Sequence, residues 1–120
     1  MNVNVLDFQE LLARSPQRYY EFLRVPSLSV GIYVLDDGAV DPQTPHSEDE
    51  VYYVARGRAR MRMENDGDVA TFDVGPGTII FVPAHTLHSF FDIKERLALL
   101  VFFGPAEHTS KSGSSATSGR

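Results

Sequence analysis

The 120-residue sequence contains no cysteine and no tryptophan, and it has no long apolar run. Without cysteine, the chain can form neither disulfide bonds nor thiolate metal sites. The longest apolar run, Leu97 to Phe103, is too short to cross a membrane. The N-terminal residues lack the basic region and apolar stretch of a signal peptide. We therefore expect a cytoplasmic protein that has no membrane partner.

Positive charge is also scarce, because 11 lysines and arginines face 16 acidic residues and leave a net charge of −5. The one basic cluster consists of four arginines at every second residue: Arg56, Arg58, Arg60 and Arg62. This alternation is typical of the solvent face of a strand rather than a nucleic-acid groove. We therefore expect no nucleic-acid partner. The length and the 42% hydrophobic fraction fit one globular domain with a single core.

The first 27 residues have the pattern of a short helical segment. Apolar residues within 5–14 follow a helical spacing, and Asn4 is a candidate N-cap. Ser15 and Pro16 are typical of an N-cap and first helical position, which predicts a second short helix through Leu23. Pro26 would end that helix. We therefore expect one or two short helices in an N-terminal segment over residues 1–27.

From residue 28 onward the pattern is that of β structure. Short segments rich in Val, Ile, Tyr and Phe alternate with turn signals. The predicted strands are 28–35, 50–56, 58–64, 69–73, 78–82, 87–93 and 97–103. With no helices between them, these strands favour an all-β antiparallel sandwich or small barrel over residues 28–104. Residues 105–120 are rich in Ser, Gly and Thr, which predicts a disordered tail in which His108 is not a ligand.

The first candidate site lies where the strand after Asp49 begins. Glu50 directly precedes an apolar run, so its face of the strand is expected to enter the interior together with Tyr52. A buried carboxylate is unfavourable unless it is paired or binds a cation. His46 would share this face if the strand extended back to it. The alternative is a solvated acidic turn over residues 48–50 with His46 on the surface.

The second candidate site follows the turn at Pro83. His88 stands at the start of a strand, where on its own it would be interpreted as a partly buried histidine bonded to the backbone. His85 occupies a turn position, where histidine tolerates unusual backbone angles better than most residues. From there its side chain could face either solvent or a pocket.

Together these segments resemble the two motifs of the cupin family. The first motif, G-x5-H-x-H-x3/4-E-x6-G, is matched in register at Gly38, Thr44, His46, Glu50 and Gly57. The second, G-x5-P-x-G-x2-H-x3-N, is matched at Gly77, Pro83, His85, His88 and Asp92, with 19 residues between the motifs. The resemblance is to small single-domain cupins and covers about residues 28–104. It implies an antiparallel double-stranded β-helix, the cupin or jelly-roll barrel.

Three positions depart from the family pattern. Thr44 stands in place of the first histidine, His85 in place of a turn glycine, and Asp92 in place of the terminal asparagine. Cupins typically bind one divalent metal through three histidines and a glutamate. The resemblance therefore assigns three ligands here, namely His46, Glu50 and His88.

Two histidines and one carboxylate with open positions suit non-haem Fe(II) chemistry, although losing a ligand could equally mean weak or absent metal binding. Glu48 is the leading substitute for the fourth ligand, ahead of Gln43 and His85.

The resemblance leaves functions of different classes open. In the first, the chain is a metal-dependent enzyme that uses Fe2+, Mn2+, Ni2+ or Zn2+ on a small polar substrate in the barrel. Dioxygenase chemistry is preferred over isomerase or lyase chemistry, because the ligand set leaves room for O2 and substrate. Tyr52 and His85 are then candidates for proton transfer, and Tyr33 is a weaker one.

In the second hypothesis, the chain is a non-catalytic small-ligand-binding or sensory cupin with weak or no metal. In the third, the barrel is packed shut and has a mainly structural role. Related cupins often pair through their sheets, and the apolar run 97–103 suits a strand buried on both sides. We therefore expect a homodimer.

Overall fold

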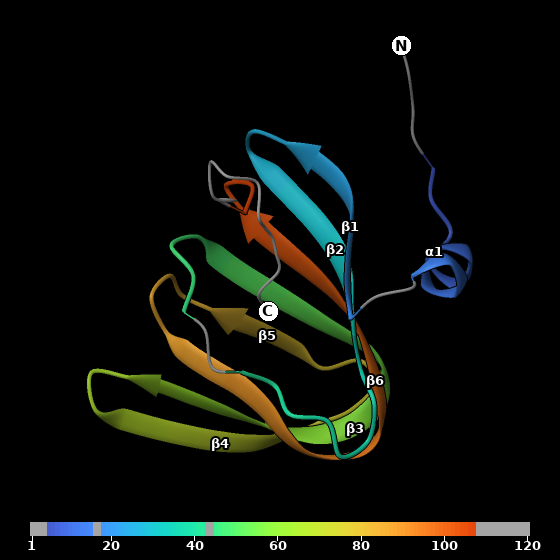
Figure 1. The fold of residues 1–120 in the computed structure, drawn as a ribbon. Coiled ribbons are helices and arrows are strands. Elements are labelled where there is room, and N and C mark those ends of the chain that lie inside the picture. The colour runs from blue at the N-terminus through green and yellow to red at the C-terminus, as the bar shows by residue number, and fades with distance from the viewer. Residues whose placement is uncertain (1–4, 16–17, 43–44, 108–120) are drawn as a thin grey trace.

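The computed structural model describes residues 5–15, 18–42 and 45–107. It contains one helix and six strands, shown in Figure 1. These are α1 (Phe8–Arg14), β1 (Tyr19–Val25), β2 (Leu28–Leu35), β3 (Asp49–Asn65), β4 (Asp68–Val74), β5 (Ile79–Val82) and β6 (Leu87–Gly104). All strand pairs are antiparallel, which confirms the predicted all-β class.

Helix α1 confirms the first predicted helix. Its N-cap is Asp7, whose side chain accepts a hydrogen bond from the N–H of Glu10 at 3.0 Å, and not Asn4, which lies outside the described residues. Leu11 is buried against Ile32 and Val34 of β2. The helix therefore covers part of the outer face of the sheet, on the side of β1 and β2 (Figure 1).

The predicted second helix, however, is wrong. Residues 19–25 form strand β1, which pairs with β2 from Tyr19 opposite Tyr33 to Val25 opposite Leu28. The segment YYEFLRV contains three aromatic residues and a valine, types that pack well on a pleated sheet. The edge of β2 provides the pairing partner, and this tertiary pairing outweighs the local Ser-Pro signal. Pro26 lies in the β1–β2 turn and does not end a helix.

The sheet is built around two long strands. Its strand order is β1-β2-β6-β3-β4, and β5 pairs with the first half of β3. Four of the predicted strands therefore form only two strands in the structure. Residues 50–56 and 58–64 both belong to β3, and residues 87–93 and 97–103 both belong to β6. The register shifts between Val54 and Arg60, near Gly57 at φ 93°. Such bulges bend a strand, so the sheet curls over its inner face (Figure 1).

The core lies on the inner face of this curl. Its largest fully buried side chains include Tyr33, Tyr52, Phe90 and Phe103. The predicted alternation along β3 is present, since Met61 is fully buried while the arginines point outward. Within the described residues the strand path stays open and does not close by hydrogen bonds into a complete barrel.

The chain after β6 turns back onto the sheet. Ala106 donates its N–H to the carbonyl of Pro26 at 3.2 Å, and Glu107 is also held there. The first residues of the predicted tail are therefore part of the folded domain. The rest of that tail, with His108, lies outside the described residues, as do Gln43 and Thr44. In the described part of the chain, no helix is long and apolar enough to cross a membrane.

Candidate metal centre

Glu50 is a carboxylate inside the core. It is the second residue of β3, lies between Val82 of β5 and Phe103 of β6, and is 1% exposed. The strand alternation that buries Tyr52 and Val54 also turns Glu50 inward, as the sequence predicted. A carboxylate in this position needs a cation or hydrogen-bond donors to be stable in its charged form.

His88 faces Glu50 from the neighbouring strand β6. Its Nδ1 lies 2.8 Å from the carbonyl oxygen of Thr86, and its Nε2 lies 3.2 Å from Oε1 of Glu50. A carbonyl oxygen can only accept, so Nδ1 carries the proton and donates. The other nitrogen therefore meets the carboxylate. This is the orientation of a metal-ligating histidine whose second nitrogen is fixed by the backbone.

His46 reaches the same place from a loop. Because β3 begins at Asp49, the strand does not extend back to His46, and the condition for a shared strand face with Glu50 is not met. Instead, the carbonyl of His46 accepts a hydrogen bond from the N–H of His85 at 2.6 Å, which ties the two predicted motifs together. The centroid of the His46 ring lies 5.1 Å from that of the Phe103 ring and 5.7 Å from that of the His88 ring.

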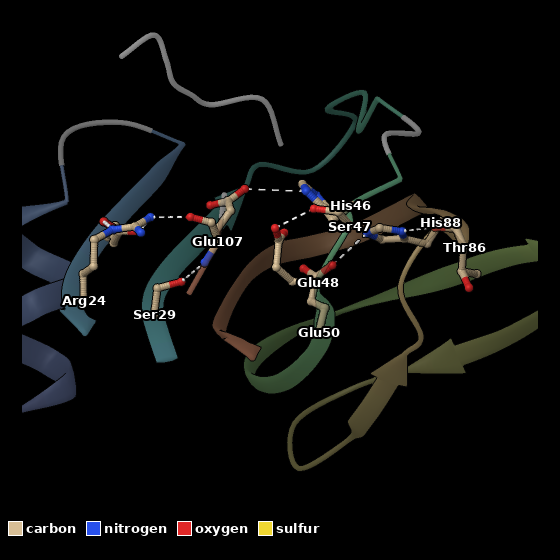
Figure 2. A network of polar contacts seen from close by, with 10 residues as sticks. Arg24, Ser29, His46, Ser47, Glu48, Glu50, Thr86, His88 and Glu107 are labelled. Atoms are coloured by element: carbon tan, nitrogen blue, oxygen red, sulfur yellow. Dashed lines mark hydrogen bonds and ion pairs between the residues drawn. The ribbon is translucent and has the colours of Figure 1, made fainter. Parts of the chain in front are cut away.

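Three candidate ligands thus meet in one cluster. One ligand atom each from His46, Glu50 and His88 lies within 4.8 Å of the others. Figure 2 shows these side chains converging from the loop, β3 and β6. A neutral imidazole lone pair beside a buried carboxylate is unfavourable unless a cation lies between them or the imidazole takes up a second proton. The donor set of two imidazoles and a carboxylate therefore fits a divalent transition metal.

Glu48 is buried near this cluster but is not part of it. It is 6% exposed, and its carboxylate accepts a hydrogen bond from the hydroxyl of Ser47 at 2.6 Å. The three-residue cluster does not include Glu48. Its role as a fourth ligand stays a prediction.

The two candidates for proton transfer differ in position. Tyr52 is 1% exposed and its ring lies 6.0 Å from that of His88, on the same strand face as Glu50. His85 is exposed and has φ 68°, a left-handed conformation that explains why the family pattern has glycine at this turn. Both roles stay predictions.

Two further carboxylates were missed by the sequence reasoning. Asp41 accepts a hydrogen bond from the hydroxyl of Tyr33 and another, at 2.7 Å, from the N–H of Phe90. Glu107 places Oε2 3.6 Å from Nδ1 of His46. The sequence carries no signal for Asp41, and Glu107 falls in the predicted tail.

Comparison with known proteins agrees with this geometry. The model of the cupin domain family matches residues 31–103. The chain belongs to the cupins. An uncharacterized protein of Streptomyces coelicolor is 44% identical to this cupin over 89 residues, which are 74% of this chain and 81% of that protein. The family resemblance and the jelly-roll fold predicted from the sequence are therefore confirmed.

Solved structures with the same fold include proteins of different sizes. The Bacillus halodurans protein BH2720 superposes with a TM-score of 0.77 at 19% identity, over 89% of this cupin and 84% of that chain. At this identity the likeness shows the fold alone. A single-residue variant of Bacillus subtilis oxalate decarboxylase is 27% identical, with a TM-score of 0.64 over 67% of this cupin and 22% of that chain. The cupin is therefore similar to only part of that enzyme.

Proposed function

We propose that this cupin binds one divalent transition metal through His46, Glu50 and His88. The observation that carries the proposal is the buried cluster of three donor atoms within 4.8 Å. Its members come from three separate segments of the chain, and His88 is fixed by a backbone carbonyl as metal ligands usually are. Fe2+, Mn2+, Ni2+ and Zn2+ all accept such ligands.

We further propose that the protein is a metal-dependent enzyme that acts on a small polar molecule inside the curl of the sheet. When bound, the metal supplies Lewis acidity and, as iron, positions for dioxygen and substrate. Three protein ligands leave such positions open, which favours a dioxygenase over an isomerase or lyase. The similarity to part of an oxalate decarboxylase supports a catalytic role but assigns no substrate.

The chain's own residues would then divide the work around the reacting molecule. The burial of Glu50 and His88 keeps bulk water from the ligands. Tyr52, on the same face, is proposed to hold or donate a proton through its hydroxyl. His85, exposed at the adjoining turn, is proposed to exchange protons with solvent.

A second candidate function is binding of a small ligand without metal. The observation that favours it is Thr44, which occupies the position of the family's first histidine. In this case His88 would carry a second proton and pair with Glu50 as an imidazolium. Metal content separates the two candidates.

The test is elemental analysis of protein purified without chelator. We expect about one equivalent of a transition metal, lost in Glu50→Ala and His88→Ala because each removes a ligand. Glu95→Ala, which removes an exposed carboxylate from the same strand as His88, should keep the metal. Less than about 0.1 equivalent, with no reloading, would overturn the metal site and favour the second candidate.

A further inference from the structure

Glu107 lies beside His46 even though it follows the last strand. Its Oε2 is 3.6 Å from Nδ1 of His46, and the two side chains are only 18% and 12% exposed. In the view of Figure 2, Glu107 and His88 lie on opposite sides of His46. At this distance the contact is electrostatic rather than a hydrogen bond. The carboxylate thus faces Nδ1 of His46, which leaves the other ring nitrogen, Nε2, to serve as the ligand atom.

The backbone of Glu107 is fixed by the β1–β2 hairpin. Its N–H donates to the hydroxyl of Ser29 at 2.8 Å, and its carbonyl accepts from Nη2 of Arg24 at 2.7 Å. The preceding residue, Ala106, donates to the carbonyl of Pro26 at 3.2 Å. Ser29 is fully buried, so this anchor belongs to the folded core. These three hydrogen bonds therefore fix the backbone position from which the Glu107 side chain extends.

The cationic part of this anchor is permanently charged. Arg24 also donates two hydrogen bonds to the carboxylate of Glu21, at 3.0 and 2.9 Å. The hydrogen bond to Glu21 raises the pKa of Arg24 above its ordinary value. Arg24 therefore holds the Glu107 carbonyl at any pH at which the protein is folded.

A carboxylate next to one imidazole nitrogen selects the tautomer. It attracts an N–H and repels a lone pair, so Glu107 favours the proton of His46 on Nδ1. The lone pair then lies on Nε2, which becomes the ligand nitrogen. In metal sites, carboxylates that act on a ligating histidine in this way change metal affinity by about 10- to 100-fold.

We propose that Glu107 is a positioning residue that holds His46 in its Nδ1-protonated, ligand-ready form. The inference rests on the proposed metal site and extends it to the β1–β2 hairpin, which touches none of the three ligands in the contacts described above. Glu107 is not itself a ligand in this account, since the three-residue cluster does not include it.

The first readout is the affinity of the full chain for Zn(II) by calorimetry. Glu107→Ala should bind about 10- to 100-fold more weakly than the wild type, and Glu107→Gln, which keeps an acceptor oxygen, should recover part of the loss. Glu95→Ala is the matched control, because it removes an exposed carboxylate and should leave the affinity unchanged. Circular dichroism checks that each variant is folded, and Glu107→Gln decides the matter if Glu107→Ala is not.

The second readout is the tautomer of His46 in metal-free protein, from long-range proton–nitrogen NMR. The Nδ1-protonated form should dominate in the wild type and lose population in Glu107→Ala, a change that a merely structural role would not produce. An unchanged tautomer together with Zn(II) affinity within about twofold of the wild type overturns the inference. If the wild type binds no Zn(II), the proposed function fails, while the tautomer still decides the role of Glu107.

Discussion

At the scale of single residues, the polar side chains of the core are held by partners from distant parts of the sequence. The Asp41 carboxylate accepts from the N–H of Phe90, 49 residues away, and the Ser29 hydroxyl accepts from the N–H of Glu107, 78 residues away. The motif spacing predicted the cluster of His46, Glu50 and His88, because each candidate ligand lies at a fixed position in a short pattern. Asp41 and Glu107 belong to no local pattern, so only the folded chain reveals them.

Replacing Asp41 tests one of these long-range anchors. Asp41→Ala removes the acceptor of two hydrogen bonds and leaves the hydroxyl of the fully buried Tyr33 without it. We expect the free energy of unfolding to fall by about 3 kcal/mol, measured by urea denaturation. Asp37→Ala, in an exposed turn, should change it by less than about 0.5 kcal/mol. Equal effects of the two substitutions would show that Asp41 is no anchor.

At the scale of elements, the sequence predicted where strand segments lie more reliably than whether two neighbouring segments belong to one continuous strand. Strand β2 was predicted at its observed bounds, since its apolar run is bounded by clear turn signals. The segments on either side of Gly57 were separated because glycine usually marks a turn. In the structure Gly57 lies at a bend within β3, and the pairing with β6 continues across it. Pairing between strands is a long-range property that local signals do not contain.

Gly57 and Gly67 make a matched pair for this bend. Both have positive φ, 93° and 85°, but a Cβ at Gly57 would lie 2.2 Å from the carbonyl oxygen of Arg96, whereas one at Gly67 would meet nothing within 4 Å. Gly67→Ala should cost about 1–2 kcal/mol of stability from backbone strain alone. Gly57→Ala should cost about 3–4 kcal/mol, because the β3–β6 contact must also open.

Denaturation curves of the two alanine variants measure this difference. A midpoint for Gly57→Ala that matches that of Gly67→Ala would mean that the close approach of the two strands is unimportant.

At the scale of the whole molecule, the bent strands bring both motifs and the segment just after β6 to one place. The sequence predicted the cupin fold and the three residues of the cluster, but it assigned β1 to a helix and Glu107 to a tail. Both errors have one cause, since each segment is held mainly by contacts with the rest of the fold. The proposed metal site would therefore depend on the folded sheet as a whole, and metal binding should stabilise that sheet.

Metal-dependent stability checks this coupling. Zn(II) at about 100 times its Kd should add about 2.7 kcal/mol and raise the Tm by several degrees in thermal denaturation. A chelator should reverse the shift, and Glu50→Ala should show none, because it lacks a ligand. A similar rise in Glu50→Ala would place the bound metal elsewhere on the chain.

The homodimer stays a prediction, and the outer sheet face provides a way to test it. Tyr53 of β3 pairs with Ile79 of β5, and Phe81 lies two residues further along β5. Tyr53, Ile79 and Phe81 are 38%, 70% and 56% exposed, respectively. We expect light scattering to give twice the 13.4 kDa mass of the chain, and Phe81→Lys to give a single chain by placing charge on this face. A single-chain mass for the wild type would contradict the prediction.

The most direct measurement of the central claim is anomalous diffraction at the metal absorption edge, from crystals grown without chelator and loaded with Zn(II). The account predicts one peak between His46, Glu50 and His88, about 2.0–2.2 Å from a donor atom of each. The absence of a peak there, or a peak at other residues, would contradict it.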